Sequence, residues 1–164
     1  MFMGYQIGIA ADTLPYRLIS GKQKNRQVAS ISLLHDIPVR PRVQDTEYYE
    51  TMTKIFKMRE QFGMKQAQKL FYWNNQEYVG VTPEKCYATL FSHPGKDVLA
   101  FVSNLSHEQQ TVELKLNLAK LGLEGKALKA VDPLTGKAVE ISADCKIAVP
   151  LASEDWVYLW ISSK

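Results

Sequence analysis

The sequence has little cysteine, little net charge and no long hydrophobic run. Its only cysteines, Cys86 and Cys145, are too few for a disulfide scaffold or a four-cysteine zinc site, and we expect two small buried apolar side chains. A net charge of +3 creates only a modest field, so no nucleic-acid partner is predicted. The apolar run at residues 1–11 is about half the roughly 20 residues that a membrane span needs, so no membrane partner is predicted either. We recognise no signal peptide in this chain and assign no cellular location.

What the sequence does contain is typical of a globular protein. It is 46% hydrophobic and 23% charged, and 164 residues suit one domain or one domain with an attached segment. The arginines are distributed unevenly, because all five lie within the first 59 residues and the second half carries only lysines as cations. This asymmetry predicts a boundary near residue 80, with an α/β segment at 1–80 and a separate domain at 81–164.

The α/β segment begins with residues 2–10, which are apolar on both faces of an extended chain and predict a buried strand. Val28, Ile31 and Leu34 follow at helical spacing and predict a helix of about four turns that ends before Pro38. A strand, a loop, a helix and a proline-rich exit together suggest one βα unit. One such unit cannot cover both faces of its own strand, so it needs a partner.

A second helix is predicted over residues 47–62, where Gly63 is placed to end it. Its expected apolar face consists of Tyr48, Met52, Ile55, Phe56 and Phe62. Residues 70–73 and 78–81 flank the Asn74-Asn75 pair and predict a hairpin or a strand pair.

The second half has short β-branched or aromatic runs between turn signals. These runs are residues 86–91, 98–102, 112–118, 128–131, 139–141, 147–151 and 156–161. Val112, Leu114 and Leu116 alternate with polar residues, which indicates a strand with one solvated face. The spacing is typical of an antiparallel β-sandwich, so the predicted class is α+β: a C-terminal antiparallel β-sandwich after a short mixed α/β segment with two helices.

Candidate chemistry is sparse. The His35-Asp36 pair lacks further ligands at matched spacing, and the chain has no phosphate loop and no Gly-x-Ser-x-Gly elbow, so we predict no metal, no cofactor and no catalytic residue. Two carboxylates, Asp12 and Asp36, lie near aromatic and cationic residues that suit a sugar cleft. The candidate carbohydrate-binding residues are Asp12, Tyr16, Arg17, His35, Asp36 and Arg40. Helix capping by Asp36 and ion pairing by Arg17 are the structural alternatives.

The three tryptophans suggest a sugar platform or, alternatively, structural packing. On the last predicted strand Trp156, Tyr158 and Trp160 share one face, and the opposite face is aliphatic. Two apolar faces favour a central strand between the sandwich core and a packed neighbour over an exposed platform.

Three motifs of the second half carry a family resemblance: Ser103-Asn104-Leu105, Asp132 with Thr135-Gly136, and the last strand at 157–161. They resemble the C-terminal β-sandwich that follows the (β/α)8 barrel in many glycoside hydrolases. The upstream segments "YQIGIAADTLPYRLISGK" and "SLLHDIPVRPR" are similar to the closing part of such a barrel, as in proteins related to glycoside hydrolase family 123. The resemblance implies a carbohydrate-processing parent in which the sandwich braces the barrel. At most one of the eight βα units of such a barrel is present, so the resemblance does not imply hydrolase activity for this chain.

Three hypotheses follow. The leading one is a non-catalytic accessory β-sandwich of a glycoside-hydrolase-like protein. The second is a carbohydrate-binding module that uses exposed aromatic residues. The third is an interaction protein that forms a homo-oligomer through its apolar N-terminal segment.

Overall fold

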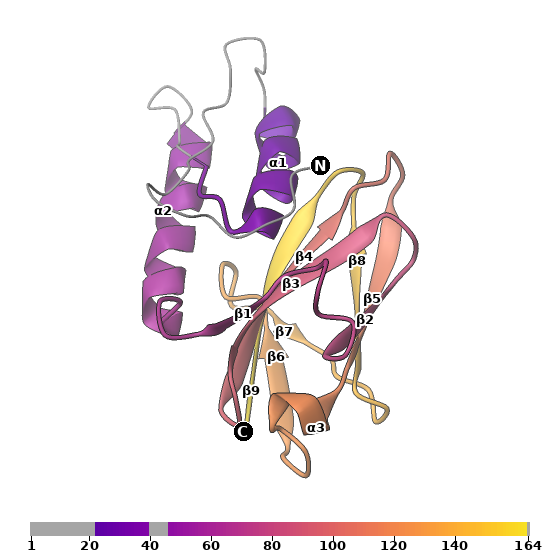
Figure 1. The fold of residues 1–164 in the computed structure, drawn as a ribbon. Helices are drawn as coiled ribbons and strands as arrows, with labels where there is room; N and C mark the ends of the chain where they lie inside the picture. The colour runs from indigo at the N-terminus through magenta and orange to yellow at the C-terminus, as the bar shows by residue number, and fades with distance from the viewer. Residues whose placement is uncertain (1–21, 40–45, 164) are drawn as a thin grey trace.

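The computed structural model describes residues 22–39 and 46–163 of the chain, with side chains from residue 26 onward (Figure 1). The strand predicted at residues 2–10 lies outside these ranges, as do the candidate residues Asp12, Tyr16, Arg17 and Arg40. Self-association through the N-terminal segment therefore stays a prediction.

Two antiparallel sheets form the body of the protein, which confirms the predicted α+β class with a β-sandwich (Figure 1). The larger sheet has the strand order β1-β3-β4-β9-β6-β7, and the smaller has the order β2-β5-β8. The strands are β1 Gln68–Leu70, β2 Val79–Thr82, β3 Cys86–His93, β4 Asp97–Asn104, β5 Gln110–Leu116, β6 Leu128–Val131, β7 Ala138–Val139, β8 Lys146–Leu151 and β9 Trp156–Ser163.

Helices cover the face of the larger sheet that points away from the smaller one (Figure 1). They are α1 Lys22–Ser32, the 3-10 helix η1 Leu33–His35 and α2 Thr46–Phe62. A short helix, α3 Leu118–Leu121, connects β5 to β6. The sequence predicted the strand of β5 as far as residue 118, but Asn117 caps α3 by accepting a hydrogen bond from the backbone N–H of Lys120, so the strand ends at Leu116.

The core between the two sheets is aliphatic. Val112, Leu114 and Leu116 point inward from β5 while Thr111 and Lys115 are exposed, as the alternation predicted. Leu90, Ala100 and Leu159 from the larger sheet are fully buried in the same core. Burial of these side chains on both inner faces holds the sandwich together.

A second core lies between the larger sheet and the helices. Phe91, Phe101 and Tyr158 of the sheet pack there against Met52 and Ile55 of α2. Strand β9 faces both cores, because Leu159 and Ile161 join the aliphatic one while Trp156 and Tyr158 join the second. The prediction of a central strand between the sandwich core and a packed neighbour is therefore confirmed.

The predicted apolar face of α2 needs one correction. Tyr48, Met52, Ile55 and Phe62 are buried as expected, but Phe56 is 46% exposed. Met58 faces the core instead. Residues three or four positions apart lie on the same face of a helix, and Met58 lies three residues after Ile55 and four before Phe62.

The helix end at Gly63 follows the prediction. Gly63 has a φ of 77°, in the left-handed region that favours glycine, and its N–H donates to the carbonyl of Glu60.

The hairpin predicted around Asn74-Asn75 is wrong. Strand β1 pairs with β3, whereas β2 pairs with β5 in the other sheet. The buried amide of Asn75 donates to the carbonyls of Leu70 and Ala88, at 3.3 Å and 2.8 Å, which fixes a crossover between the sheets. All of β1 and part of β2 lie before residue 81, within the segment 1–80 that was expected to be separate from the sandwich. Both sheets therefore include residues of that segment.

Two smaller differences concern the second half and the thiols. Strand β7 ends at Val139, so Ile141 lies outside it. Cys86 is buried as predicted, but Cys145, which lies in a turn with a φ of 61°, is only half-buried.

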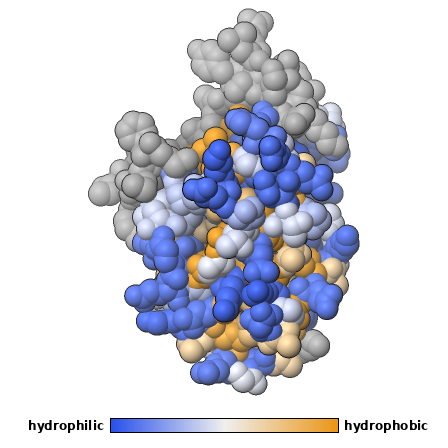
Figure 2. Space-filling view, turned by 90° about the vertical axis from the view of Figure 1, so that its right-hand side faces the viewer, coloured by the Kyte–Doolittle hydropathy of each residue, from blue (hydrophilic) through white to orange (hydrophobic). Residues whose placement is uncertain are grey.

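The described surface is largely hydrophilic on the face in Figure 2, with apolar patches between the polar side chains. Within residues 22–39 and 46–163, no helix is long and apolar enough to cross a membrane.

Candidate functional site

Asp36 lies where η1 ends, at the junction between the helices and the larger sheet. Its backbone is left-handed with a φ of 58°, and its N–H donates to the carbonyl of Leu33 at 3.0 Å. The carboxylate is 8% exposed and pairs with Arg59 of α2 and with the Nζ of Lys69 in β1, the latter at 2.6 Å. Asp36 therefore connects three elements: η1, α2 and β1.

Arg59 carries its charge into the second core. Burial opposes that charge, but interactions with Tyr158 and Asp36 outweigh burial and raise the pKa of the guanidinium. Tyr158 is fully buried, and burial raises the pKa of its hydroxyl although Arg59 opposes the shift. The charged Arg59 of α2 thus lies beside Tyr158 of β9 and pairs with Asp36.

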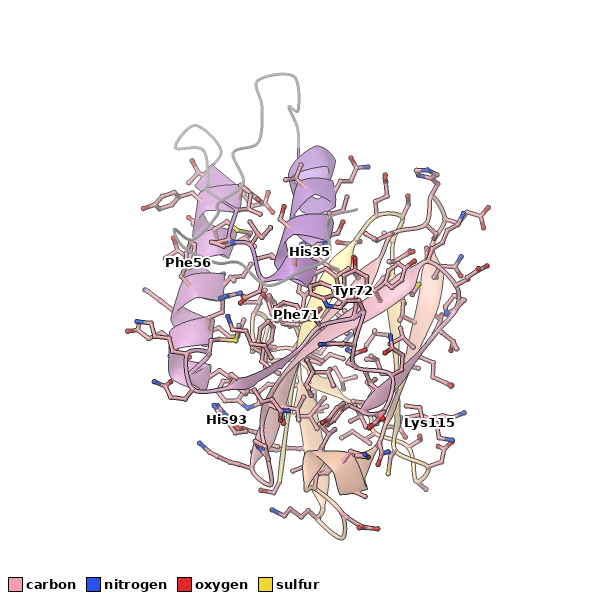
Figure 3. All side chains as sticks on the ribbon, viewed as in Figure 1. His35, Phe56, Phe71, Tyr72, His93 and Lys115 are labelled. Carbon is pink, nitrogen blue, oxygen red and sulfur yellow. The ribbon has the colours of Figure 1, made fainter. Side chains whose placement is uncertain are left out.

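His35 belongs to an aromatic group on the other side of η1. Its ring centroid lies 5.3 Å from Tyr72 and 5.5 Å from Trp73, and its Nε2 is 3.4 Å from the Tyr72 hydroxyl. Trp73 stacks on Phe71 at 4.4 Å. Figure 3 shows His35, Phe71 and Tyr72 gathered between η1 and the sheet. Burial lowers the pKa of His35, so the neutral ring is favoured in the fold.

His93, at the end of β3, holds the C-terminal end of α2. Its Nδ1 lies 2.7 Å from Oδ1 of Asp97, and its ring stacks on Phe62 with centroids 4.6 Å apart. The indole N–H of Trp160 donates to the other oxygen of Asp97 at 3.3 Å. This histidine and carboxylate thus serve a helix–sheet contact.

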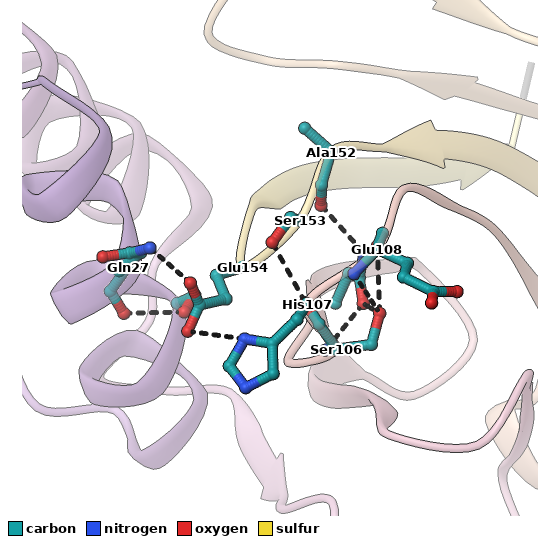
Figure 4. A network of polar contacts seen from close by, with 9 residues as sticks. Gln27, Ser106, His107, Glu108, Ala152, Ser153 and Glu154 are labelled. Carbon is teal, nitrogen blue, oxygen red and sulfur yellow. Dashed lines mark hydrogen bonds and ion pairs between the residues drawn. The ribbon is translucent and has the colours of Figure 1, made fainter.

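A polar network connects α1 to two loops of the sandwich (Figure 4). Gln27 donates to the carboxylate of Glu154, and Nδ1 of His107 lies 3.6 Å from the same group. Ser153 donates to the carbonyl of Ser106 at 3.4 Å. The β4–β5 and β8–β9 loops are thereby joined to each other and to α1.

Arg26 makes the second contact between α1 and the sandwich. Its Nε donates to the Asp155 carboxylate at 2.5 Å and its Nη2 to the carbonyl of Trp156 at 2.8 Å. The guanidinium also lies 4.5 Å from the centroid of the Trp156 ring.

Asn104 and Asp132, from the motifs of the second half, form hydrogen bonds within loops. Asn104 is fully buried, donates to the carbonyls of Glu108 and Ala152 at 2.8 Å each, and accepts from the N–H of Ser106 at 2.9 Å. Asp132 accepts from the N–H of Leu134 at 2.9 Å, which closes the predicted turn. These side chains shape the loops at which β4 and β6 end.

Of the six candidate residues, the structure describes His35 and Asp36 and joins them to separate groups of side chains. Arg59 and Lys69, the partners of Asp36, were not predicted. The position of Arg59, four residues after Ile55 and three before Phe62, was the available signal, since it lies beside the buried face of the helix. Among the residues described, no group of three or more His, Cys, Asp or Glu is arranged to hold a metal ion.

The fold and these contacts define a β-sandwich domain with one sheet face covered by helices. Residues 51–149 match the family model of the glycoside hydrolase 123 C-terminal domain, which is more than half of the chain, so the protein belongs to that family. The resemblance to a glycoside-hydrolase C-terminal region is confirmed. No curated protein matches the chain.

Several solved glycoside hydrolases share the fold. A GH27 β-L-arabinopyranosidase of Geobacillus stearothermophilus has a TM-score of 0.54 and 13% identity, over 85% of this chain and 30% of that chain. An Anoxybacillus α-amylase has a TM-score of 0.52 and 16% identity, over 73% and 23%. The α-galactosidase I of Mortierella vinacea has a TM-score of 0.51 and 9% identity, over 88% and 38%. The chain thus corresponds to well under half the length of each of these proteins, and the likeness concerns the fold.

Proposed function

We propose that this chain is a non-catalytic accessory domain of a glycoside-hydrolase-like protein, in which the sandwich holds the helical segment that precedes it. The observation that carries the proposal is the covered outer face of the larger sheet. Phe91, Phe101 and Tyr158 bury their side chains completely against the helices. A sheet face that is covered by packed helices suits a domain that holds those helices in place.

The polar contacts at this interface support the same role. Arg26 and Gln27 bind the loop before β9, and Arg59 reaches Asp36 and the neighbourhood of Tyr158. Because hydrogen bonds to charged groups depend on direction, they fix the orientation of the helices in addition to their attachment.

Asp36 is the candidate carboxylate that the structure describes, and its surroundings favour a structural role. It is 8% exposed and held by two cations, which keeps a substrate from reaching it. A catalytic acid or base must reach the proton that it transfers.

Hydrolysis of a panel of aryl glycosides by the purified chain tests the proposal. We expect no turnover above the buffer rate, and we expect Asp36→Asn to lower the thermal stability only. Turnover that disappears in Asp36→Asn, while a Lys65→Gln control stays active, would overturn the non-catalytic role.

Amide hydrogen exchange tests the bracing role. Met52→Ala removes a buried contact of α2, and we expect faster exchange in α2 while β5 and β8 stay protected. Equal loss of protection in all elements would show that the helices are part of one cooperative unit instead of a braced segment.

A further inference from the structure

The outer face of α2 carries two large aromatic side chains that are exposed. Tyr49 is 48% exposed and Phe56 is 46% exposed. Figure 3 shows Phe56 on α2, at the side of the molecule opposite the smaller sheet. We propose that this face of α2 binds the same face of a second copy of the chain, so that two α2 helices pack antiparallel in a symmetric dimer.

The exposed side chains form one apolar stripe along the helix. Tyr49, Thr53 and Phe56 follow each other at steps of four and three residues, which places them on one face over about 10 Å of helix. The hydroxyl of Thr53 donates to the carbonyl of Tyr49 at 2.9 Å, so this polar group is satisfied within its own helix. A small residue between two rings allows a second helix to approach closely, because the distance between packed helices depends on the side chains at the contact.

The charges beside the stripe are complementary to themselves. Glu50 and Lys57 are exposed, and their separation of seven residues places both on the same flank of the stripe. Among the described residues, neither has an ion-pair partner within the chain. If Tyr49 of each copy faces Phe56 of the other, Glu50 of each copy lies beside Lys57 of the other. The antiparallel dimer therefore gains two ion pairs, which a parallel arrangement of the helices would not form.

The other charges of α2 fit the same arrangement. Glu60 continues the stripe after Phe56, and in the antiparallel pair it lies near Thr46, the first residue of the other helix. An acidic side chain is favoured at that end, because the free backbone N–H groups give it a partial positive charge. Glu47 and Lys54 each precede a stripe aromatic by two residues, so they lie about 200° around the helix from it and outside the contact.

The size of the face indicates a weak dimer. Each copy contributes two half-exposed rings, so the interface is smaller than the roughly 1,200 Å² at which stable interfaces begin. We expect a dissociation constant of about 10 to 100 µM. The monomer therefore predominates at low micromolar concentration, where the stability of the single chain does not depend on the stripe.

Sedimentation velocity of the full chain, at concentrations from about 5 to 300 µM, tests the inference. We expect the average mass to rise from that of one chain toward that of two and no further, because a two-fold interface is closed. Phe56→Ser and Tyr49→Ser are each expected to raise the dissociation constant about tenfold or more. Ile31, which is 48% exposed on α1, gives the matched control, and Ile31→Ser is expected to leave the constant unchanged.

Reversal of the charges tests the antiparallel arrangement. Glu50→Lys and Lys57→Glu each bring like charges together at two places, so each is expected to weaken association at least about threefold in a buffer of low ionic strength. The double variant with both changes restores the opposite charges and is expected to return the constant to within about twofold of the native value. Failure of the double variant to recover would overturn the antiparallel dimer.

Three further results would also overturn the inference. The first is a chain that stays monomeric up to about 300 µM, and the second is association that continues beyond two copies. The third is an equal effect of Ile31→Ser and Phe56→Ser, which would assign the association to another surface or to general hydrophobicity. A thermal melt at low concentration checks the fold of each variant. The proposed non-catalytic role is tested separately, by aryl glycoside hydrolysis.

Discussion

The two cores of this protein are built from different side chains. The core between the sheets is mainly aliphatic, with residues such as Leu90, Leu114 and Ile147. The core between the larger sheet and the helices is rich in aromatic residues and also encloses the Arg59–Asp36 pair. An aliphatic core is stabilised by non-directional burial, whereas ion pairs and hydrogen bonds set the angle at which one layer meets another. The comparison indicates that the first core makes the domain and the second attaches the helices.

The aliphatic core should give the largest effect. Leu114 is fully buried, so we expect Leu114→Ala to lower the free energy of unfolding by about 2 to 5 kcal/mol. Urea denaturation measures the change, and Thr111→Ala on the exposed face of β5 is the control. A decrease in the free energy of unfolding below about 1 kcal/mol would mean that neighbouring side chains fill the cavity left by Leu114. The aliphatic core would then not be the main source of stability, contrary to the comparison above.

The helix–sheet core should respond strongly to loss of its charge pair. Arg59→Met leaves Asp36 with Lys69 as its remaining cation, and we expect a loss of about 1 to 3 kcal/mol. A double-mutant cycle with Asp36→Asn should show that the two changes are not additive. Additive effects would indicate that the pair contributes no coupling between α2 and η1.

Acidification should weaken the helix–sheet core through His35. Burial lowers the pKa of His35 in the fold, so the unfolded chain binds the proton at higher pH, and stability is lost as the pH falls through about 6.5 and below. We expect the native protein to lose more stability between pH 7.5 and pH 5 than the His35→Phe variant does. Parallel pH profiles of the two proteins, measured by urea denaturation, would contradict this prediction.

The outer face of α2 should give the smallest effect. Phe56 is 46% exposed, and we expect Phe56→Ser to change stability by no more than about 0.5 kcal/mol. Thermal unfolding measures the change. A loss above about 1 kcal/mol would show that this side chain is covered in solution, and α2 would then have a second packed face.

The sequence predicted the strands of the sandwich well, because alternation at β5 and the two apolar faces of β9 follow from local spacing. The distribution of strands between sheets could not be predicted in the same way. Strands β1 and β2 are close in sequence but belong to different sheets, and the buried hydrogen bonds of Asn75 that separate them depend on the assembled fold.

The candidate site was predicted only in part. His35 and Asp36 were selected for their chemistry, and both lie at the helix–sheet junction. The partner of Asp36, Arg59, is 23 residues away in sequence, and no local pattern connects the two.

The position of β9 after both β4 and β6 in the sequence has a consequence for folding during synthesis. Strand β9 lies between β4 and β6 and contributes to both cores, so neither core is complete until Trp156–Ser163 has left the ribosome. Until then the inner edges of β4 and β6 are unpaired, and such edges are prone to pair with other chains. We therefore expect the nascent chain to expose these strand edges until β9 inserts between β4 and β6.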